Sequence, residues 1–350
     1  MKTKSVVTLK DVAQAANVSI STVSRVIRGF EYINDDTKEK VQKAIHRLNY
    51  EPNADARRLK YGRTYTIGFI FPDISNPFFS NALKAAYTYI QSSEFAHYEL
   101  LFYNTDGNPA REKKALDFFV GRQMEGIIIA SSASQMIINH IGRILKEKNI
   151  AIVAVDNKLG NLDIDLVTSE NFLGAHQLAT HLMGLGHTTI AAITGPMNES
   201  SSIERLNGFR TALQEHGFSL DDSLVAHGEW TKDSGIEAMK KLLRENPKLS
   251  AVFGFNNSMT MGALTVLRSQ GISVPRDVAL VSFDDVEYGD LLNPALTSTS
   301  TSWYELGRVS ARLLLERIAD GNSGPAKLVK LPLEMIIRES CGLYRKPDTG

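Results

Sequence analysis

Six short runs of β-branched and aromatic residues, separated by segments of helical periodicity, most constrain what this chain can fold into. They span residues 66–71, 126–130, 151–156, 189–195, 251–256 and 278–284. Short strands that alternate with helices build parallel sheets that helices cover on both faces. Because the pattern restarts near residue 189 and the chain has 350 residues, we expect an α/β fold with two doubly wound lobes.

The composition excludes several classes of protein. No run of about 18 apolar residues occurs, and the N-terminus leads into a charged helical pattern instead of a secretory signal. We therefore expect a cytoplasmic protein without membrane contact. The single cysteine, Cys341, cannot form an internal disulfide, and the eight histidines lack the spacing of metal ligands. The sequence thus predicts no metal site and no cofactor.

Motifs of common enzymes are also missing from the sequence. It contains no Walker A sequence, no nucleophile elbow and no zinc-protease motif. The glycines of residues 184–189 precede a predicted strand, whereas those of a dinucleotide site follow one. We therefore expect no catalytic residues, and we interpret the two lobes as a binding domain.

The net charge of zero hides an asymmetry between the start of the chain and the rest. Residues 1–63 carry 13 lysines and arginines against 7 acidic residues, whereas residues 64–350 carry 26 against 32. A basic head on an acidic body indicates that the head binds a polyanion.

The basic head has the pattern of three short helices. Thr8 and Asp11 form a capping-box pattern before the first helix, and Ser19 is a candidate N-cap for the second. The second helix buries small β-branched side chains and leaves a short polar and basic face, which is typical of a recognition helix in a helix-turn-helix motif. A small bundle with a solvated charged face is the alternative. The predicted outer face comprises Ile20, Ser21, Ser24, Arg25 and Arg28.

A short basic segment follows the head. Pro52 begins about two helical turns, in which Leu59 stands beside Arg57, Arg58 and Lys60. A leucine next to basic residues is a device with which minor-groove binders unstack a base step. The alternative is a linker helix that docks Leu59 on its own domain.

Polar side chains follow the strands of both predicted lobes. Ligands of open parallel sheets bind beyond the carboxyl ends of the strands, so we expect a site there. Hydroxyl, amide and carboxylate groups with aromatic rings beside them suit a polyhydroxylated ligand. Each residue alone has a structural alternative as a loop former or core residue. The strand-end residues include Asp73, Ser75, Asn76, Ser131, Ser132, Asp156, Asn256, Asn257, Asp284 and Asp285, with Phe78, Phe79 and Trp230 beside them in sequence.

These motifs together resemble the LacI/GalR family of bacterial transcription regulators and, in the body, periplasmic sugar-binding proteins. The resemblance implies a helix-turn-helix headpiece, a hinge helix and two Rossmann-like lobes. It rests on residues 8–13, 18–19, 22–27, 48–54 and 56–59 in the head and on 72–79 and 205–209 in the body. The implied boundaries are a headpiece at 1–51, a hinge at 52–63 and an effector-binding domain at 64–350, with lobes at about 64–165 plus 296–325 and about 166–295 plus 326–342.

The resemblance further implies a homodimeric repressor that binds a pseudo-palindromic double-stranded DNA operator. The implied DNA-binding residues are Thr8, Ser19, Ile20, Ser21, Thr22, Ser24, Arg25, Arg28, Asn34, Ala56, Leu59 and Lys60.

A small-molecule effector, a sugar or sugar derivative, is expected between the lobes, where it changes operator affinity. Trp303, near a crossover between the lobes, is expected to close the cleft. Control by a partner protein or a non-sugar metabolite is the alternative. The implied effector contacts are Asn76, Phe78, Phe79, Ser132, Asp156, Arg205, Trp230, Asn256, Asp284 and Trp303.

One hinge residue departs from the family pattern. Asp55 stands where the family usually has valine, at the contact between the two hinge helices of the dimer. Two carboxylates about 4 Å apart repel by about 1 kcal/mol at the dielectric constant of water. An acid in the first turn also favours the helix dipole, and Arg57 or Arg58 can pair with it.

We predict that Asp55→Val strengthens operator binding because it removes this repulsion. Fluorescence anisotropy titration of labelled operator at matched salt concentration measures the Kd. An unchanged or higher Kd for the variant would show that the dipole and the arginine pairing outweigh the repulsion.

Overall fold

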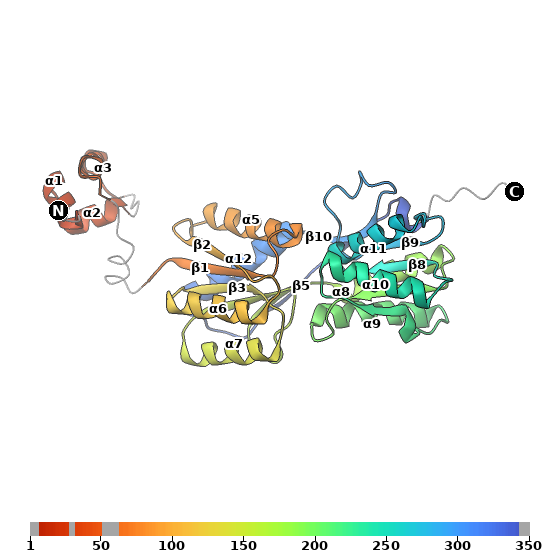
Figure 1. The fold of residues 1–350 in the computed structure, drawn as a ribbon. Coiled ribbons are helices and arrows are strands. Elements are labelled where there is room, and N and C mark those ends of the chain that lie inside the picture. Colours follow the sequence, from red (N-terminus) through yellow and green to blue (C-terminus); the bar gives the residue numbers. More distant parts are fainter. Residues whose placement is uncertain (1–6, 28–31, 51–62, 343–350) are drawn as a thin grey trace, which may run out of the picture. The chain divides into compact units, whose positions relative to one another are not determined.

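The chain divides into two compact units, residues 1–64 and 65–350. The computed structural model describes residues 7–27, 32–50 and 63–342 (Figure 1). The predicted hinge helix, including Asp55, Ala56, Leu59 and Lys60, lies outside these residues, as does Arg28.

The first unit contains three short helices in its described residues: α1 (Leu9–Ala16), α2 (Ile20–Ile27) and α3 (Asp35–Leu48). The capping box predicted for α1 is present, since Thr8 and Asp11 each bond the other's backbone N–H. α1 and α3 end at asparagines in the left-handed conformation, which this residue tolerates. The three helices share one small core, made by Val12, Ala13, Ala16, Val23, Val41, Ala44 and Tyr50.

The second unit contains two six-stranded sheets among its described residues. The first sheet has the strand order β11-β5-β4-β3-β1-β2, and all its neighbouring strands are parallel. In Figure 1 helices α5 and α12 cover one face of this sheet and α6 and α7 cover the other. The strands are β1 (Thr66–Phe71), β2 (Glu99–Asn104), β3 (Gly126–Ala130), β4 (Ala151–Val155), β5 (Asp165–Ser169) and β11 (Leu328–Leu331). The helices are α5 (Pro77–Gln91), α6 (Pro109–Gly121), α7 (Gln135–Glu147) and α12 (Trp303–Ala319).

The second sheet has the order β12-β10-β9-β8-β6-β7, in which the pair β10–β12 is antiparallel. Helix α8 packs against α9, and α10 packs against α11. The strands are β6 (Ile190–Thr194), β7 (Val225–His227), β8 (Ala251–Gly254), β9 (Ala279–Ser282), β10 (Thr297–Thr301) and β12 (Leu333–Ile336). The helices are α8 (Asn171–Gly184), α9 (Ser200–Glu215), α10 (Lys232–Glu245) and α11 (Asn257–Ser269), with short 3₁₀ turns η1 (Asp222–Leu224) and η2 (Glu339–Cys341).

The lobes exchange segments at their sheets. Within the described residues the chain changes lobe after β5, after β10 and after β11. The predicted boundaries near residues 165, 295 and 325 assigned these three strands to the opposite lobes, so they require correction. Lateral hydrogen bonds decide the matter, because β5 pairs with β4, β10 with β9, and β11 with β5. The chain therefore crosses to the other lobe after each of these strands, whereas the predicted boundaries placed each crossing before the strand.

The central strands explain the apolar runs of the sequence. Every residue of β3 and β4 is buried, as expected when helices cover both faces of a parallel sheet. No helix in the described ranges is both long enough and apolar enough to cross a membrane.

Helices α5 and α12 approach each other closely at Gly307. A Cβ atom at this position would collide with the backbone carbonyl of Ala82 on α5. Neither backbone can yield without moving a whole helix, so the glycine sets the distance between the two helices over the first sheet.

We predict that Gly307→Ala lowers the free energy of unfolding by about 1–3 kcal/mol through overpacking. Gly121→Ala, at the end of α6, is the matched control because a Cβ there meets no atom within 4 Å. Better helix propensity should leave the control neutral or slightly stabilised. Urea unfolding followed by circular dichroism measures both, and equal midpoints would contradict the packing argument.

Candidate functional site

A cavity of about 650 Å³ lies between the two lobes. Its lining comes from residues that follow the strands of both sheets, because the carboxyl ends of parallel strands meet at one edge. The first lobe contributes Asp73, Asn76, Thr105, Asp106, Ser131, Ser132, Asp156 and Asn157, and the second contributes Asn198, Glu199, Trp230, Asn256 and Asp284. Arg205 reaches the same cavity from α9.

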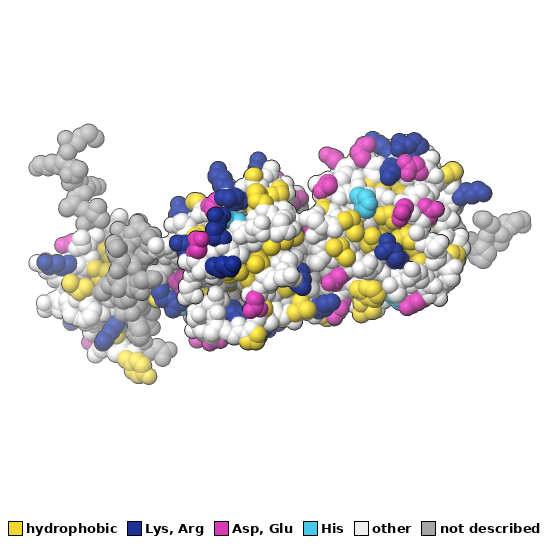
Figure 2. All heavy atoms as spheres, turned by 90° about the horizontal axis from the view of Figure 1, so that it is seen from below, with side chains coloured by type: hydrophobic (Ala, Val, Ile, Leu, Met, Phe, Trp, Pro, Cys, Tyr) yellow, Lys and Arg dark blue, Asp and Glu magenta, His cyan; other side chains and the backbone are white. Residues whose placement is uncertain are grey.

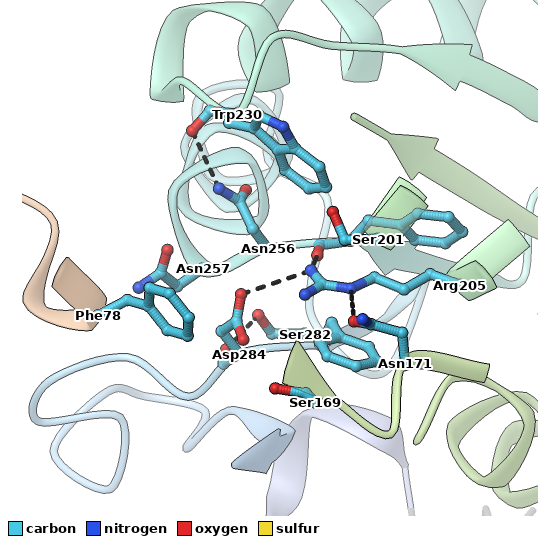
Figure 3. Close-up of polar contacts among 12 residues, drawn as sticks. Phe78, Ser169, Asn171, Ser201, Arg205, Trp230, Asn256, Asn257, Ser282 and Asp284 are labelled. Atoms are coloured by element: carbon cyan, nitrogen blue, oxygen red, sulfur yellow. Dashed lines mark hydrogen bonds and ion pairs between the residues drawn. The ribbon is translucent and has the colours of Figure 1, made fainter. Parts of the chain in front are cut away.

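Arg205 is the centre of the polar network in this cavity (Figure 3). Its side chain is buried, with 3 % of the residue exposed, and its guanidinium carbon lies 3.7 Å from the centre of the Phe283 ring. Nε donates to Asn171 Oδ1 at 2.8 Å, and Nη1 donates to the Phe255 carbonyl. The guanidinium also faces two carboxylates, at 3.6 Å from Asp284 and 3.9 Å from Asp156. A buried cation is stable here because it is both hydrogen-bonded and paired.

The two carboxylates beside Arg205 come from different lobes. Asp156 follows β4 in the first lobe, and Asp284 follows β9 in the second. Burial raises the pKa of Asp284 to about 6, with Arg205 opposing the rise and Asp156 adding to it. Burial likewise raises the pKa of Asp156, again against the attraction of Arg205. One guanidinium thus holds together acidic groups that would otherwise favour separation of the lobes.

Glu199, which the sequence analysis did not assign to the site, also lines the cavity. Its Oε2 accepts hydrogen bonds from Trp230 Nε1 and from Asn157 Nδ2, both at 2.8 Å. Burial, together with the nearby charges of Asp156 and Glu112, raises its pKa to about 8 against the opposing effect of these two hydrogen bonds. Its place in the loop between β6 and α9, six residues before Arg205, is the signal that could have revealed it.

Three cavity residues, among them Asp106 with φ 52°, adopt a conformation that is rare for residues with side chains. Asp156 has φ 69° and Trp230 has φ 60°, both in the left-handed region. Such strain is held by surrounding contacts and clusters at functional sites. Asn256 supplies one contact, since its Nδ2 donates to the Trp230 carbonyl at 3.0 Å while its Oδ1 caps α11 at Met259 N. Asn256 is therefore a positioning residue for Trp230 in this structure.

Direct contacts join the lobes around the cavity. Asn76 of the first lobe and Asn257 of the second exchange side-chain hydrogen bonds at 3.3 and 3.4 Å. Asn198 Nδ2 donates to the Ser132 carbonyl at 3.0 Å. Asn157 Oδ1 of the first lobe accepts from Ser201 N of the second at 3.0 Å. A ligand in the cavity would lie between groups whose hydrogen bonds depend on the distance between the lobes.

The structure brings together nine of the ten residues predicted to contact an effector. Trp303 is the exception, because it packs against the core of the first lobe and does not line the cavity. The Ser302 N-cap starts α12 there, and Trp303 borders a separate surface depression with Asn81 and Tyr304. The lining residues are Asn76, Phe78, Phe79, Ser132, Asp156, Arg205, Trp230, Asn256 and Asp284.

The head presents most of its predicted DNA-binding residues to solvent. Ser24 departs from the prediction, since 7 % of it is exposed. α2 packs against both α1 and α3, so its buried side is wider than half the helix and includes this small residue. Thr22 is half-buried, while Ser19 Oγ accepts from Thr22 N at 3.1 Å and caps α2. The exposed residues are Thr8, Ser19, Ile20, Ser21, Arg25 and Asn34.

Two family models match the chain. "Periplasmic binding proteins and sugar binding domain of LacI family" covers residues 64–339, and "Bacterial regulatory proteins, lacI family" covers residues 8–53. Catabolite control protein A of Priestia megaterium is 32 % identical over 95 % of this chain and 99 % of its own. The ribose operon repressor of Escherichia coli K12 is 31 % identical over 94 % and 98 %. A solved complex of the transcriptional regulator CelR with cellobiose has a TM-score of 0.72 at 30 % identity, covering 95 % of this chain and 99 % of that one.

The raised pKa of Glu199 predicts a pH-dependent stability. Between about pH 4.5 and 8 the folded chain keeps a proton on Glu199 that the unfolded chain has released. The free energy of unfolding therefore falls as the pH rises through this window. Glu199→Gln cannot ionise, so the variant should gain a few kcal/mol over the parent between pH 5 and pH 8, at about 1.4 kcal/mol per pKa unit.

Urea unfolding at several pH values measures this difference. Glu237→Gln is the control, because it makes the same substitution on the exposed surface of α10. The control should follow the pH profile of the parent. If the stability of Glu199→Gln changed with pH in parallel with that of the parent, the result would contradict the raised pKa of Glu199.

Proposed function

The chain belongs to the LacI family of bacterial regulatory proteins, and we propose that it represses transcription from an operator under the control of a ligand bound between its lobes. The observation that carries this proposal is the presence, in one chain, of an exposed helix-turn-helix face and a polar cavity built around Arg205. We also place the protein in the cytoplasm, where chromosomal DNA is accessible.

The exposed face of α2 fits the major groove. Arg25 has the bidentate donors that recognise guanine. Ile20, which is 42 % exposed, offers an apolar contact to the methyl group of thymine. Thr8, Ser19 and Asn34 stand at the N-termini of α1, α2 and α3, where backbone N–H groups favour phosphate. Ser21 adds a hydroxyl on the same exposed face.

We propose that a homodimer forms the active unit. One helix of eight residues reads only a few base pairs, so a specific site needs two copies related by two-fold symmetry. This arrangement accounts for a pseudo-palindromic operator. The hinge residues Ala56, Leu59 and Lys60, with Arg28, remain sequence-based predictions for the contacts between the half-sites.

The cavity suits a polyhydroxylated ligand. Hydroxyl groups can donate to Asp156 and Asp284 and accept from Arg205, while the Trp230 ring offers an apolar face. The related CelR structure holds cellobiose, and another relative is named for the ribose operon. The protein does not convert the ligand chemically. Ligand binding and operator binding are thermodynamically linked, so ligand and operator change each other's affinity by the same factor.

We predict that Arg25→Ala weakens specific operator binding by about 1–3 kcal/mol while non-specific binding falls much less. The operator is selected from random double-stranded DNA with the parent protein. Lys38→Ala on α3 is the control, since its ammonium already pairs with Asp35 at 3.3 Å. Fluorescence anisotropy measures both affinities. Equal losses on operator and random DNA would place Arg25 on phosphate instead of a base.

A further inference from the structure

The cavity between the lobes is strongly acidic. Among the described residues that line it, six carry carboxylates, and Arg205 is the one lysine or arginine. Residues 64–350 carry 32 acidic residues against 26 lysines and arginines, and Figure 2 shows both kinds scattered over the face that it draws. The ratio of six acids to one base in the cavity is therefore much higher than in this part of the chain as a whole. The six acidic residues are Asp73, Asp106, Asp156, Glu199, Glu229 and Asp284.

The acids at the rim are already engaged or solvated. Asp73 accepts from Ser75, and Asp106 pairs with Arg111. Glu229 is exposed. The inner acids are Asp156, Glu199 and Asp284. Glu199 is largely protonated at pH 7, and the single charge of Arg205 faces both of the other two carboxyl groups. An anionic ligand would add repulsion in a place that water screens weakly.

Glu199 is an inner acid that can accept a further hydrogen bond. The residue is 6 % exposed, yet both of its recorded hydrogen bonds, from Trp230 and Asn157, converge on Oε2. Among the described residues no hydrogen bond to Oε1 is recorded. Glu199 lines the cavity, so a ligand there can supply the hydrogen-bond donor that Oε1 lacks.

We propose that the effector is a polyol that carries a protonated amino group, such as an amino sugar, and that Glu199 Oε1 receives its ammonium. Asp156 lies close enough to add its field, and the Trp230 ring, held by the same Glu199, offers the face that cations and sugar rings both favour. This inference rests on the proposed function, because it names the ligand class of the same cavity. Phosphorylated sugars are excluded by the same charges.

Binding of an amine at Glu199 releases a proton near neutral pH. The pKa of Glu199 is about 8, so the carboxyl is largely protonated at pH 7, and a neighbouring ammonium favours its ionised form. The charged groups around it are Asp156 and Glu112, with Arg205 and Asp284 beyond Asp156. A neutral sugar lacks the charge that would drive this ionisation, so proton release separates the two ligand classes.

Matched sets of mono- and disaccharides test the proposal with the full-length protein. Each set carries a hydroxyl, amino, acetamido or phosphate group at one carbon, and thermal unfolding ranks the compounds because ligands of the folded state raise its stability. We expect an amine to bind at least tenfold more tightly than its hydroxyl and acetamido counterparts, and calorimetry in two buffers should show proton release at pH 7. A neutral or phosphorylated compound as the tightest ligand, or a panel in which no amine binds, would overturn the proposal.

Variants assign the effect to the carboxylate. Glu199→Gln should lose at least tenfold in affinity for the amine, whereas Glu237→Gln, the same substitution outside the cavity, should retain it. If Glu199→Gln fails to fold, Asp156→Asn serves instead, because asparagine tolerates the positive φ at this position. Equal affinity of parent and cavity variant for the amine would refute the role of these acids.

Operator binding separates this inference from the proposed function. An amine that binds through Glu199 without changing operator affinity supports the ligand class and refutes control of DNA binding from this cavity. A neutral compound that binds and changes operator affinity supports control of DNA binding from this cavity and refutes the proposed ligand class.

Discussion

The pairing of one buried guanidinium with carboxylates from both lobes is the interaction on which the rest of the cavity depends. Arg205 is held by Asn171 and Phe255 of its surroundings and faces Asp156 across the cleft. Without Arg205 both acids would lose their only nearby opposite charge among the described residues, and burial would drive them to the neutral form. The guanidinium therefore favours the ionised form of both carboxyl groups and joins the two lobes across the cleft.

The arrangement of the lobes follows from how parallel sheets end. All strands that reach the cleft do so with their carboxyl ends, where loops are free to carry function while the strands stay buried. Hydrogen bonds to their carbonyls hold the left-handed backbones of two cavity residues, from Thr168 to Asp156 and from Asn256 to Trp230.

Charge divides the molecule between two tasks. The head is basic and exposes Arg25 on the helix that we propose to enter the major groove, whereas the cavity is acidic and is the proposed site of a small molecule. Coupling between them needs only that the ligand favours one arrangement of the lobes, because a differential affinity for two states shifts their populations. Asn157 of the first lobe contacts Glu199 and Ser201 of the second, so a ligand can act on the arrangement of the lobes through these contacts.

The sequence by itself determined the classes of element, the two lobes and nearly half of the cavity lining. Apolar runs at strand length predict buried strands, and ligand groups gather at their carboxyl ends wherever the sheet is parallel. Tertiary structure decided which sheet β5, β10 and β11 join, because lateral pairing is not a local property. It also buried Ser24, directed Trp303 into the first lobe and brought Glu199 to Trp230 and Asn157, since these contacts join segments that the sequence alone does not place side by side.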